Sequence, residues 1–155
     1  MRRVAVLLMA VALAMVMLVP AASAGGDDNS FVASLKGRTE VPPSDTNAQG
    51  TALVKVRNGA VSYKLIVANI ENVVAAHIHC APVGVNGPVG VTLFGGAAAS
   101  PNGMLAQGPI VAPDAGNACG WADLDAVLVA LASGDTYVNV HTLQSLSGEI
   151  RGQLK

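Results

Sequence analysis

The three histidines of the chain stand in two short segments whose spacing could bring their imidazoles together. His77 and His79 are two residues apart, and His141 follows Asn139 at the same spacing. In a β-strand, side chains two residues apart point to the same side of the sheet, so each pair projects together. Imidazoles that converge from two adjacent strands form a ligand set for copper or zinc. The spacing therefore predicts a metal site of His77, His79 and His141.

The same pattern also has a structural interpretation. A His-x-His pair occurs on solvated polar faces of strands, and as two hydrogen-bonded rings that shape a loop. Spacing alone does not decide between these roles. The expected cofactor is therefore copper, with zinc as the alternative, or no metal at all.

Arg151 and Asn139 are further candidates for the neighbourhood of the histidines. Asn139 shares the side of His141 on its strand, and Arg151 alternates with Glu149 and Gln153 on the last expected strand. In one interpretation, Arg151 and Asn139 hold an anion or support a metal ligand from outside. In the other, Arg151 belongs to an exposed face and has a Glu or Gln partner. No residue is assigned a catalytic role.

Cys80 and Cys119 are the two cysteines of the chain. In an oxidising compartment, two cysteines predict one structural disulfide. Closing a loop of about 40 residues stabilises a fold by roughly 4 kcal/mol in the chain-entropy model. Cys80 follows His79 directly, so a thiolate ligand for a metal at Cys80 is the alternative.

The N-terminus has the three parts of a secretory signal peptide. Met1-Arg2-Arg3 is cationic, Val4 to Val19 is an apolar run, and small residues precede a cleavage site after Ala24. The run has 16 residues, fewer than the roughly 20 of a membrane-spanning helix. We therefore expect a periplasmic or secreted protein without a transmembrane segment after cleavage. The expected division is a signal peptide (1–24), a flexible leader (25–30) and one domain (31–155).

Composition excludes two broad classes of protein. Hydrophobic residues make up 52% of the 155 residues and charged residues 12%, which excludes an intrinsically disordered chain. The formal net charge is −1 and aromatic residues make up 3%, so the chain has neither a basic stripe for a nucleic-acid backbone nor a stacking platform for bases. Nucleic acid is therefore not an expected partner.

The clearest local signal is a β-hairpin around Asn58-Gly59, a dipeptide typical of a two-residue type I′ turn. The flanking runs are Gly50 to Arg57 and Ala60 to Val67. This turn predicts a register with one apolar face. The pairs on that face are Val56 with Val61, Val54 with Tyr63, and Ala52 with Leu65.

Further short apolar runs separated by Gly and Pro clusters predict more strands. Glu40 and Asp45 flank one such cluster, Pro42-Pro43, and are expected to be solvated loop residues. One segment differs, because apolar residues recur at helical spacing from Leu124 to Leu131, with Asp123 as the N-cap and Gly134 after the end. The expected fold is all-β, an antiparallel β-sandwich or Greek-key barrel with one short helix. The expected additional strands are Phe31 to Lys36, Val73 to His79, Gly90 to Phe94, Gln107 to Val111, Thr136 to Thr142 and Glu149 to Leu154.

Several short sequence blocks follow one another in order along almost the whole expected domain. The blocks are Phe31-x-Ala33-x-Leu35-x-Gly37, Glu40-Val41-Pro42-Pro43, Gly50-x-Ala52, Tyr63-x-Leu65, Ala76-His77-Ile78-His79, Asn86-Gly87-Pro88-Val89, Tyr137-Val138-Asn139-Val140-His141-Thr142 and Gly148-Glu149-Ile150-Arg151-Gly152. Together they resemble the CHRD domain, a module named for its repeats in chordin that also occurs as single exported domains in bacteria. This resemblance implies an extracellular β-rich module.

The histidine blocks and the final arginine strand also resemble, distantly, the copper site of Cu/Zn superoxide dismutases. This resemblance implies His77 and His79 as paired ligands, His141 as a later ligand and Arg151 as an anion-guiding residue. The sequence has no counterpart of the bridging histidine or of the zinc loop of those enzymes.

Three functions are compatible with these observations. The favoured one is an exported domain that binds copper or zinc without catalysis. The first alternative is an extracellular adhesion or protein-interaction module without metal, and the second is a superoxide dismutase-like redox enzyme. Sequence motifs of nucleophilic hydrolases and of phosphate-binding loops are not present.

Overall fold

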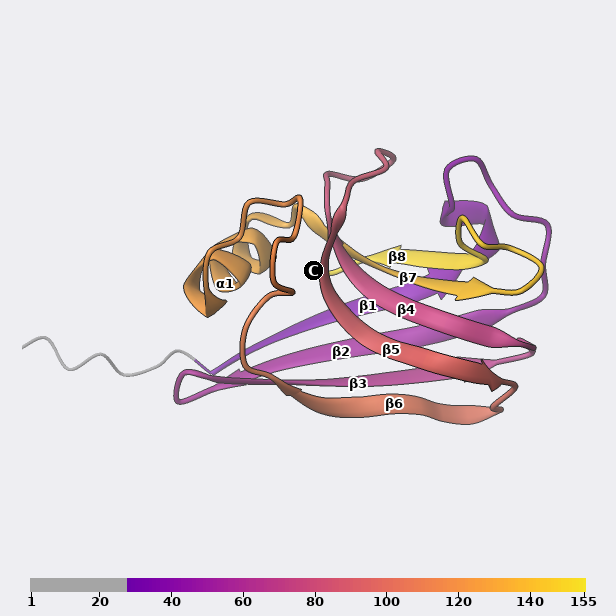
Figure 1. Cartoon of the computed structure of the whole chain (residues 1–155), viewed down its shortest axis with the longest axis horizontal. Helices are drawn as coiled ribbons and strands as arrows, with labels where there is room; N and C mark the ends of the chain where they lie inside the picture. Colours follow the sequence, from indigo (N-terminus) through magenta and orange to yellow (C-terminus); the bar gives the residue numbers. More distant parts are fainter. Residues whose placement is uncertain (1–27) are drawn as a thin grey trace, which may run out of the picture.

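Residues 28–155, the part of the chain that the computed structural model describes, form an eight-stranded antiparallel sheet and one short α-helix (Figure 1). The expected signal peptide, residues 1–24, and the first part of the expected leader lie outside these residues. The elements are β1 (Asn29–Lys36), the 3-10 turn η1 (Gly37–Thr39), β2 (Gln49–Arg57), β3 (Ala60–Ala68), β4 (Val73–Cys80), β5 (Val89–Ala99), β6 (Gly103–Ile110), α1 (Leu124–Ser133), β7 (Thr136–Thr142) and β8 (Ile150–Gln153).

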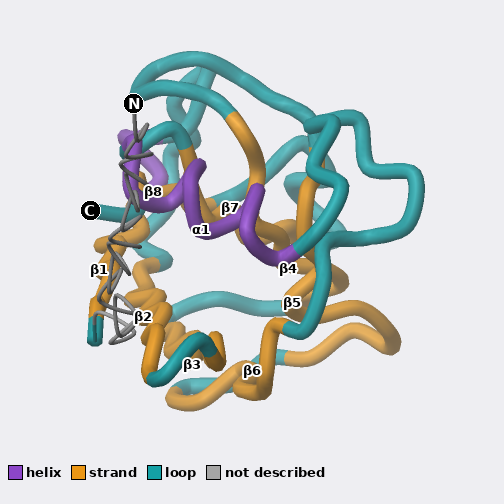
Figure 2. Tube along the Cα trace, turned by 90° about the vertical axis from the view of Figure 1, so that its left-hand side faces the viewer, coloured by secondary structure: helices purple, strands orange, loops and turns teal. Residues whose placement is uncertain are grey.

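The sheet curves into a nearly closed barrel, which confirms the expected all-β class (Figure 2). The strand order is β5-β4-β7-β8-β1-β2-β3-β6, so β5 and β6 are its two edges. The Tyr63 hydroxyl on β3 donates a hydrogen bond to the Leu93 carbonyl on β5, which brings the β5 edge near β3, the neighbour of the β6 edge. Closure of this kind protects strand edges that would otherwise be open to pairing with another chain.

The β2–β3 hairpin has the expected register. Val56 pairs with Val61, and Val54 pairs with Tyr63. Asn58 and Gly59 both have positive φ angles, 50° and 78°, as a type I′ turn requires. The apolar face of this hairpin lines the barrel interior, so burial of the core selects the register.

The short helix α1 lies across one end of the barrel (Figure 2). The Asp123 carboxylate accepts a hydrogen bond from the Ala126 N–H at 3.0 Å, and Gly134 ends the helix with φ 76°. Val127 and Leu131 are fully buried in the core, so α1 closes this end with its apolar side. The expected cap residues of the helix are confirmed.

Several strand boundaries differ from the expected ones, most of them by one residue, and the largest differences are in β1, β5 and β6, where β6 begins at Gly103 rather than at Gln107. β1 begins at Asn29 rather than at Phe31, because Asn29 and Ser30 find pairing partners on β2. β5 continues from Phe94 to Ala99, where small residues pair with β4 through several bulges. In β1 and β5 backbone pairing extends the strand beyond its apolar side-chain pattern.

A disulfide joins Cys80, at the end of β4, to Cys119 in the loop before α1. The two cysteines are 39 residues apart, and they are the pair that the cysteine count predicts. Because both sulfur atoms are in this bond, Cys80 is not available as a thiolate ligand.

Candidate metal centre

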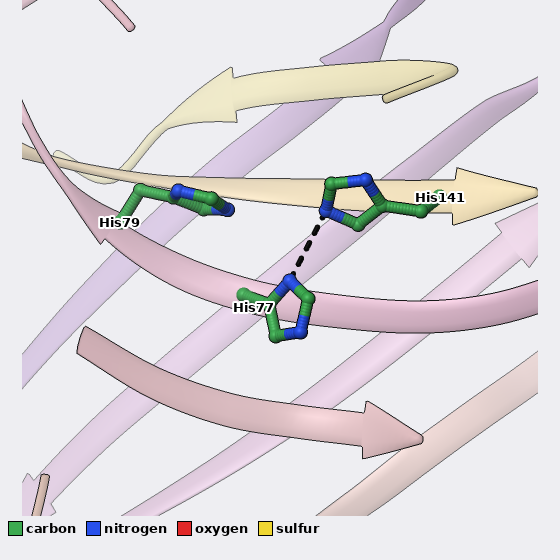
Figure 3. Close-up of side chains that lie close together, drawn as sticks. All are labelled: His77, His79 and His141. Carbon is green, nitrogen blue, oxygen red and sulfur yellow. Dashed lines mark hydrogen bonds between the residues drawn. The ribbon is translucent and has the colours of Figure 1, made fainter. Parts of the chain in front are cut away.

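The three histidines project from the outer face of two neighbouring strands, β4 and β7 (Figure 3). In this antiparallel pairing His77 stands opposite Asn139, and His79 stands opposite Tyr137. His141 is a diagonal neighbour of His77, a position from which long side chains on adjacent strands meet. The alternating side chains of the same strands are buried in the core: Ile78, Val138 and Val140.

The imidazoles are close enough to share one ion. His77 Nδ1 lies 3.1 Å from His141 Nε2, and one ring nitrogen of each of the three histidines lies within 4.8 Å of the others. Two nitrogens that bind one ion at about 2.0–2.1 Å can be at most about 4.2 Å apart. In a tetrahedral site the nitrogens are about 3.4 Å apart, so the first pair is already close enough and the widest pair needs to close by about 1.4 Å at most.

Backbone carbonyls orient two of the rings. The Gly87 carbonyl lies 2.9 Å from His79 Nδ1, and the Leu146 carbonyl lies 2.9 Å from His141 Nδ1. A carbonyl oxygen only accepts hydrogen bonds, so both Nδ1 atoms carry the proton and both Nε2 atoms keep a lone pair. Such outer hydrogen bonds fix the tautomer of metal-ligating histidines.

The Nε2 atom of His79 is buried and has no hydrogen-bond partner among residues 28–155. The whole side chain is only 7% exposed. A buried acceptor without a partner is unfavourable by about 1–3 kcal/mol. His141 Nε2, in contrast, accepts a hydrogen bond from His77 Nδ1. The cluster therefore holds one lone pair that a cation or a hydrogen-bond donor would satisfy.

The three imidazoles are neutral at pH 7. Desolvation by burial, together with the neighbouring histidines, lowers the pKa of His77 from 6.5 to about 4. Burial also lowers the pKa of His79, with a smaller contribution from Arg151, and that of His141. Since only neutral imidazole binds a metal, no proton needs to be displaced from a charged ring at physiological pH.

Arg151 is buried rather than exposed, so its interpretation as part of a solvated face is wrong. Its guanidinium carbon lies 3.4 Å from the centre of the Tyr137 ring, and the His79 ring stacks on Tyr137 with centroids 4.7 Å apart. Its N–H groups donate to the Asn86 side chain and to the Val85 carbonyl. Arg151 therefore holds the loop 81–88, which in turn supplies the carbonyl that orients His79.

Glu40 is also buried, with 6% exposure, and is not the solvated loop residue that the sequence indicates. Its carboxylate accepts a hydrogen bond from Asn139 Nδ2 at 2.6 Å. Burial raises the pKa of Glu40 to about 7, and Arg151 opposes this rise. Asp45 is exposed, as expected. The sequence offers no signal that separates the two acids, because only the folding of the loop after η1 places Glu40 over β7.

The comparison with protein families decides the family. The family model described as CHRD domain matches residues 31–154, a range that contains all three histidines and both cysteines. The chain belongs to the CHRD domain family. No curated protein and no solved structure matches this CHRD domain.

A helix that crosses a bilayer needs about 20 apolar residues. Among residues 28–155, no helix is long and apolar enough to cross a membrane.

Proposed function

We propose that this CHRD domain binds one transition-metal ion through His77, His79 and His141, as a non-catalytic metal-binding module exported from the cell. The observation that carries the proposal is the buried lone pair of His79 Nε2, which has no partner among the described residues and belongs to a cluster of neutral imidazoles. A solvated pair of histidines would instead leave both rings hydrated. A bound cation satisfies this atom.

Copper is the favoured ion, and zinc is the alternative. All three ligands are imidazole nitrogens, which suit copper and zinc rather than magnesium or calcium. At a given nitrogen site, Cu²⁺ binds more tightly than Zn²⁺ among divalent first-row metals. The signal-peptide pattern of residues 1–24 supports export, to the periplasm or outside the cell.

The redox alternative has less support from the contacts. The resemblance to superoxide dismutases assigns Arg151 to guiding an anion. In this chain two of its nitrogens are engaged by Asn86 and Val85, and its planar face covers Tyr137. A guanidinium held in this way supports a loop and is poorly placed to attract a substrate anion.

The test is metal analysis of residues 25–155 after loading with Cu²⁺ or Zn²⁺ and gel filtration. We expect about one ion per chain. In His77→Ala, His79→Ala or His141→Ala, we expect the affinity to fall by more than about 100-fold, because loss of an outer partner alone typically costs 10–100-fold. Less than 0.1 ion per wild-type chain would contradict the proposal.

A matched control keeps the number of histidines constant. Lys64 is exposed on β3, on a different part of the sheet. The double variant His77→Ala with Lys64→His contains three histidines but lacks the cluster. We expect it to bind as weakly as His77→Ala. Wild-type affinity in the double variant would mean that binding depends on the number of histidines rather than on their arrangement.

A further inference from the structure

A second buried acceptor without a partner lies beside the histidines. Asn139 is 3% exposed, and its Oδ1 atom has no hydrogen-bond partner among residues 28–155. Asn139 stands directly opposite His77 and diagonally to His79, whose Nε2 atom is also without a partner. Two lone pairs on adjacent positions of one face therefore lack a donor. Both acceptors are therefore open to a donor or a cation from outside the chain.

The direction of the Asn139 amide is set by Glu40. A carboxylate accepts hydrogen bonds, so the atom 2.6 Å from Glu40 Oε1 is the Nδ2 group of Asn139. The space beside Nδ2 is filled, because a Cβ added to Gly148 would lie 2.2 Å from it. The loop with Glu40 is attached to β8, since the Thr39 hydroxyl donates to the Arg151 carbonyl. Oδ1 diverges from Nδ2, and the strand that flanks β7 on the side away from β8 is β4, where His77 stands opposite Asn139.

We propose that the ion held by the three histidines keeps an exchangeable water as its fourth ligand, and that Asn139 Oδ1 accepts a hydrogen bond from this water. This inference rests on the proposed function. An amide oxygen suits magnesium, calcium or manganese better than copper or zinc, which favours contact through water over direct ligation. Zinc prefers four ligands, so an ion held by only three protein nitrogens has a fourth position that water can fill. His77 and His141 are partly exposed, so water can reach it.

The acceptor determines which ligands this position takes. A ligand that carries a proton, such as water, donates a hydrogen bond to Oδ1. An aprotic anion such as azide cannot, and its negative charge meets the partial charge of the amide oxygen. Asn139 therefore selects protic ligands, and Glu40 acts as a positioning residue that keeps Oδ1 directed at the ion.

The experiment uses the Cu²⁺-loaded protein, after its metal content has been measured. Water-proton relaxation reports an exchangeable water on the copper, and azide is titrated by its charge-transfer absorption. We expect excess relaxation over the Zn²⁺-loaded protein. We also expect Asn139→Leu, which has no acceptor, to bind azide about tenfold more tightly. Asn139→Asp, which adds a negative charge beside the position, is expected to bind azide more weakly than wild type.

Two further variants separate positioning from a general effect on the fold. Glu40→Ala frees the amide, and we expect tighter azide binding, as in Asn139→Leu. Thr136→Val removes a buried hydroxyl that also lacks a partner but lies on the inner face of β7. We expect Thr136→Val to bind azide like wild type, because it leaves the metal centre untouched.

The outcomes distinguish the two proposals. A wild-type protein that takes up no metal overturns the proposed function. A protein that binds one ion but shows no excess relaxation has no exchangeable water, which overturns this inference and leaves metal binding intact. Equal azide affinities in wild type and Asn139→Leu overturn it as well. If Asn139→Leu does not fold, the comparison of wild type with Asn139→Asp decides in the same way.

Discussion

His79 and its polar neighbours are side chains buried away from solvent. These neighbours are Glu40, Asn139 and Arg151. The pKa of His77 is about 4, and that of Glu40 is about 7. Burial lowers the pKa of the histidine and raises the pKa of the glutamate, because it disfavours the charged form of each group. Near pH 7 the His77 imidazole is therefore neutral and the Glu40 carboxyl is about half ionised.

These shifts give the metal-free protein two opposing dependences of stability on pH. Between pH 4 and 6.5 the unfolded chain binds more protons at His77, so the free energy of unfolding decreases as the pH falls. Between pH 4.5 and 7 the folded chain binds more protons at Glu40, so the free energy of unfolding decreases as the pH rises. In wild type the two contributions partly cancel.

Glu40→Gln removes the second contribution and can still accept the Asn139 hydrogen bond. We therefore expect the free energy of unfolding of the variant to fall more steeply than that of wild type between pH 7 and pH 5. Urea unfolding in the presence of a chelator measures both slopes. Parallel curves for the two proteins would show that the carboxyl group of Glu40 titrates alike in the folded and unfolded states.

At the scale of elements, the loop 81–88 positions the histidine cluster as much as the strands do. Gly87 supplies the carbonyl that orients His79, and its own N–H donates to the Tyr137 hydroxyl at 3.1 Å. The same loop receives two hydrogen bonds from Arg151. Contacts from three strands thus hold one short loop against the histidines.

Gly87→Ala tests this role of the loop. An added Cβ would lie 1.9 Å from the Cys80 carbonyl oxygen, so the loop must move and His79 loses its carbonyl partner. We expect the metal affinity to fall by about 10–100-fold, as for loss of an outer partner of a ligating histidine. Isothermal titration with Zn²⁺ measures the change.

Gly84→Ala is the control within the same loop. Gly84 has φ +79° and open space around it, so the substitution strains the backbone by about 1 kcal/mol without a clash. We expect its metal affinity to stay within about twofold of wild type. A similar loss of affinity in both variants would mean that any disturbance of the loop, and not the Gly87 carbonyl, explains the effect.

At the scale of the whole molecule, the histidine cluster lies on β4 and β7, the second and third strands from the β5 edge of the sheet, and an ion bound there would link the two strands. Binding to the folded state alone stabilises it by about 2.7 kcal/mol when the free ion is at 100 times its Kd. For a domain of this size, that corresponds to a rise in Tm of about 10 °C.

Thermal unfolding with and without Zn²⁺ checks this expectation. His77→Ala should unfold at the same temperature under both conditions, whether or not its metal-free Tm equals that of wild type. A rise of equal size in His77→Ala would locate the stabilising ion elsewhere on the molecule.

The sequence by itself determined the features that depend on near neighbours in the chain. The hairpin register follows from Asn58-Gly59 and from alternation, and α1 follows from its cap residues. Alternation also places His77 and His79 on one side of a strand. These features follow from local backbone geometry, so they can be predicted without knowing the fold. The family could be recognised in the same way, because its blocks are contiguous.

Only the tertiary structure decided which distant groups meet. The strand order makes β4 and β7 neighbours, and this brings His141 to within 3.1 Å of His77 across 64 residues of sequence. The fold also buries Glu40 against Asn139 and places Arg151 over the Tyr137 ring. The sequence pattern instead indicated a solvated loop for Glu40 and an exposed strand face for Arg151. Contacts of this kind depend on closure of the sheet and on loops packed over its outer face, because burial is a property of the assembled barrel and no single segment encodes it.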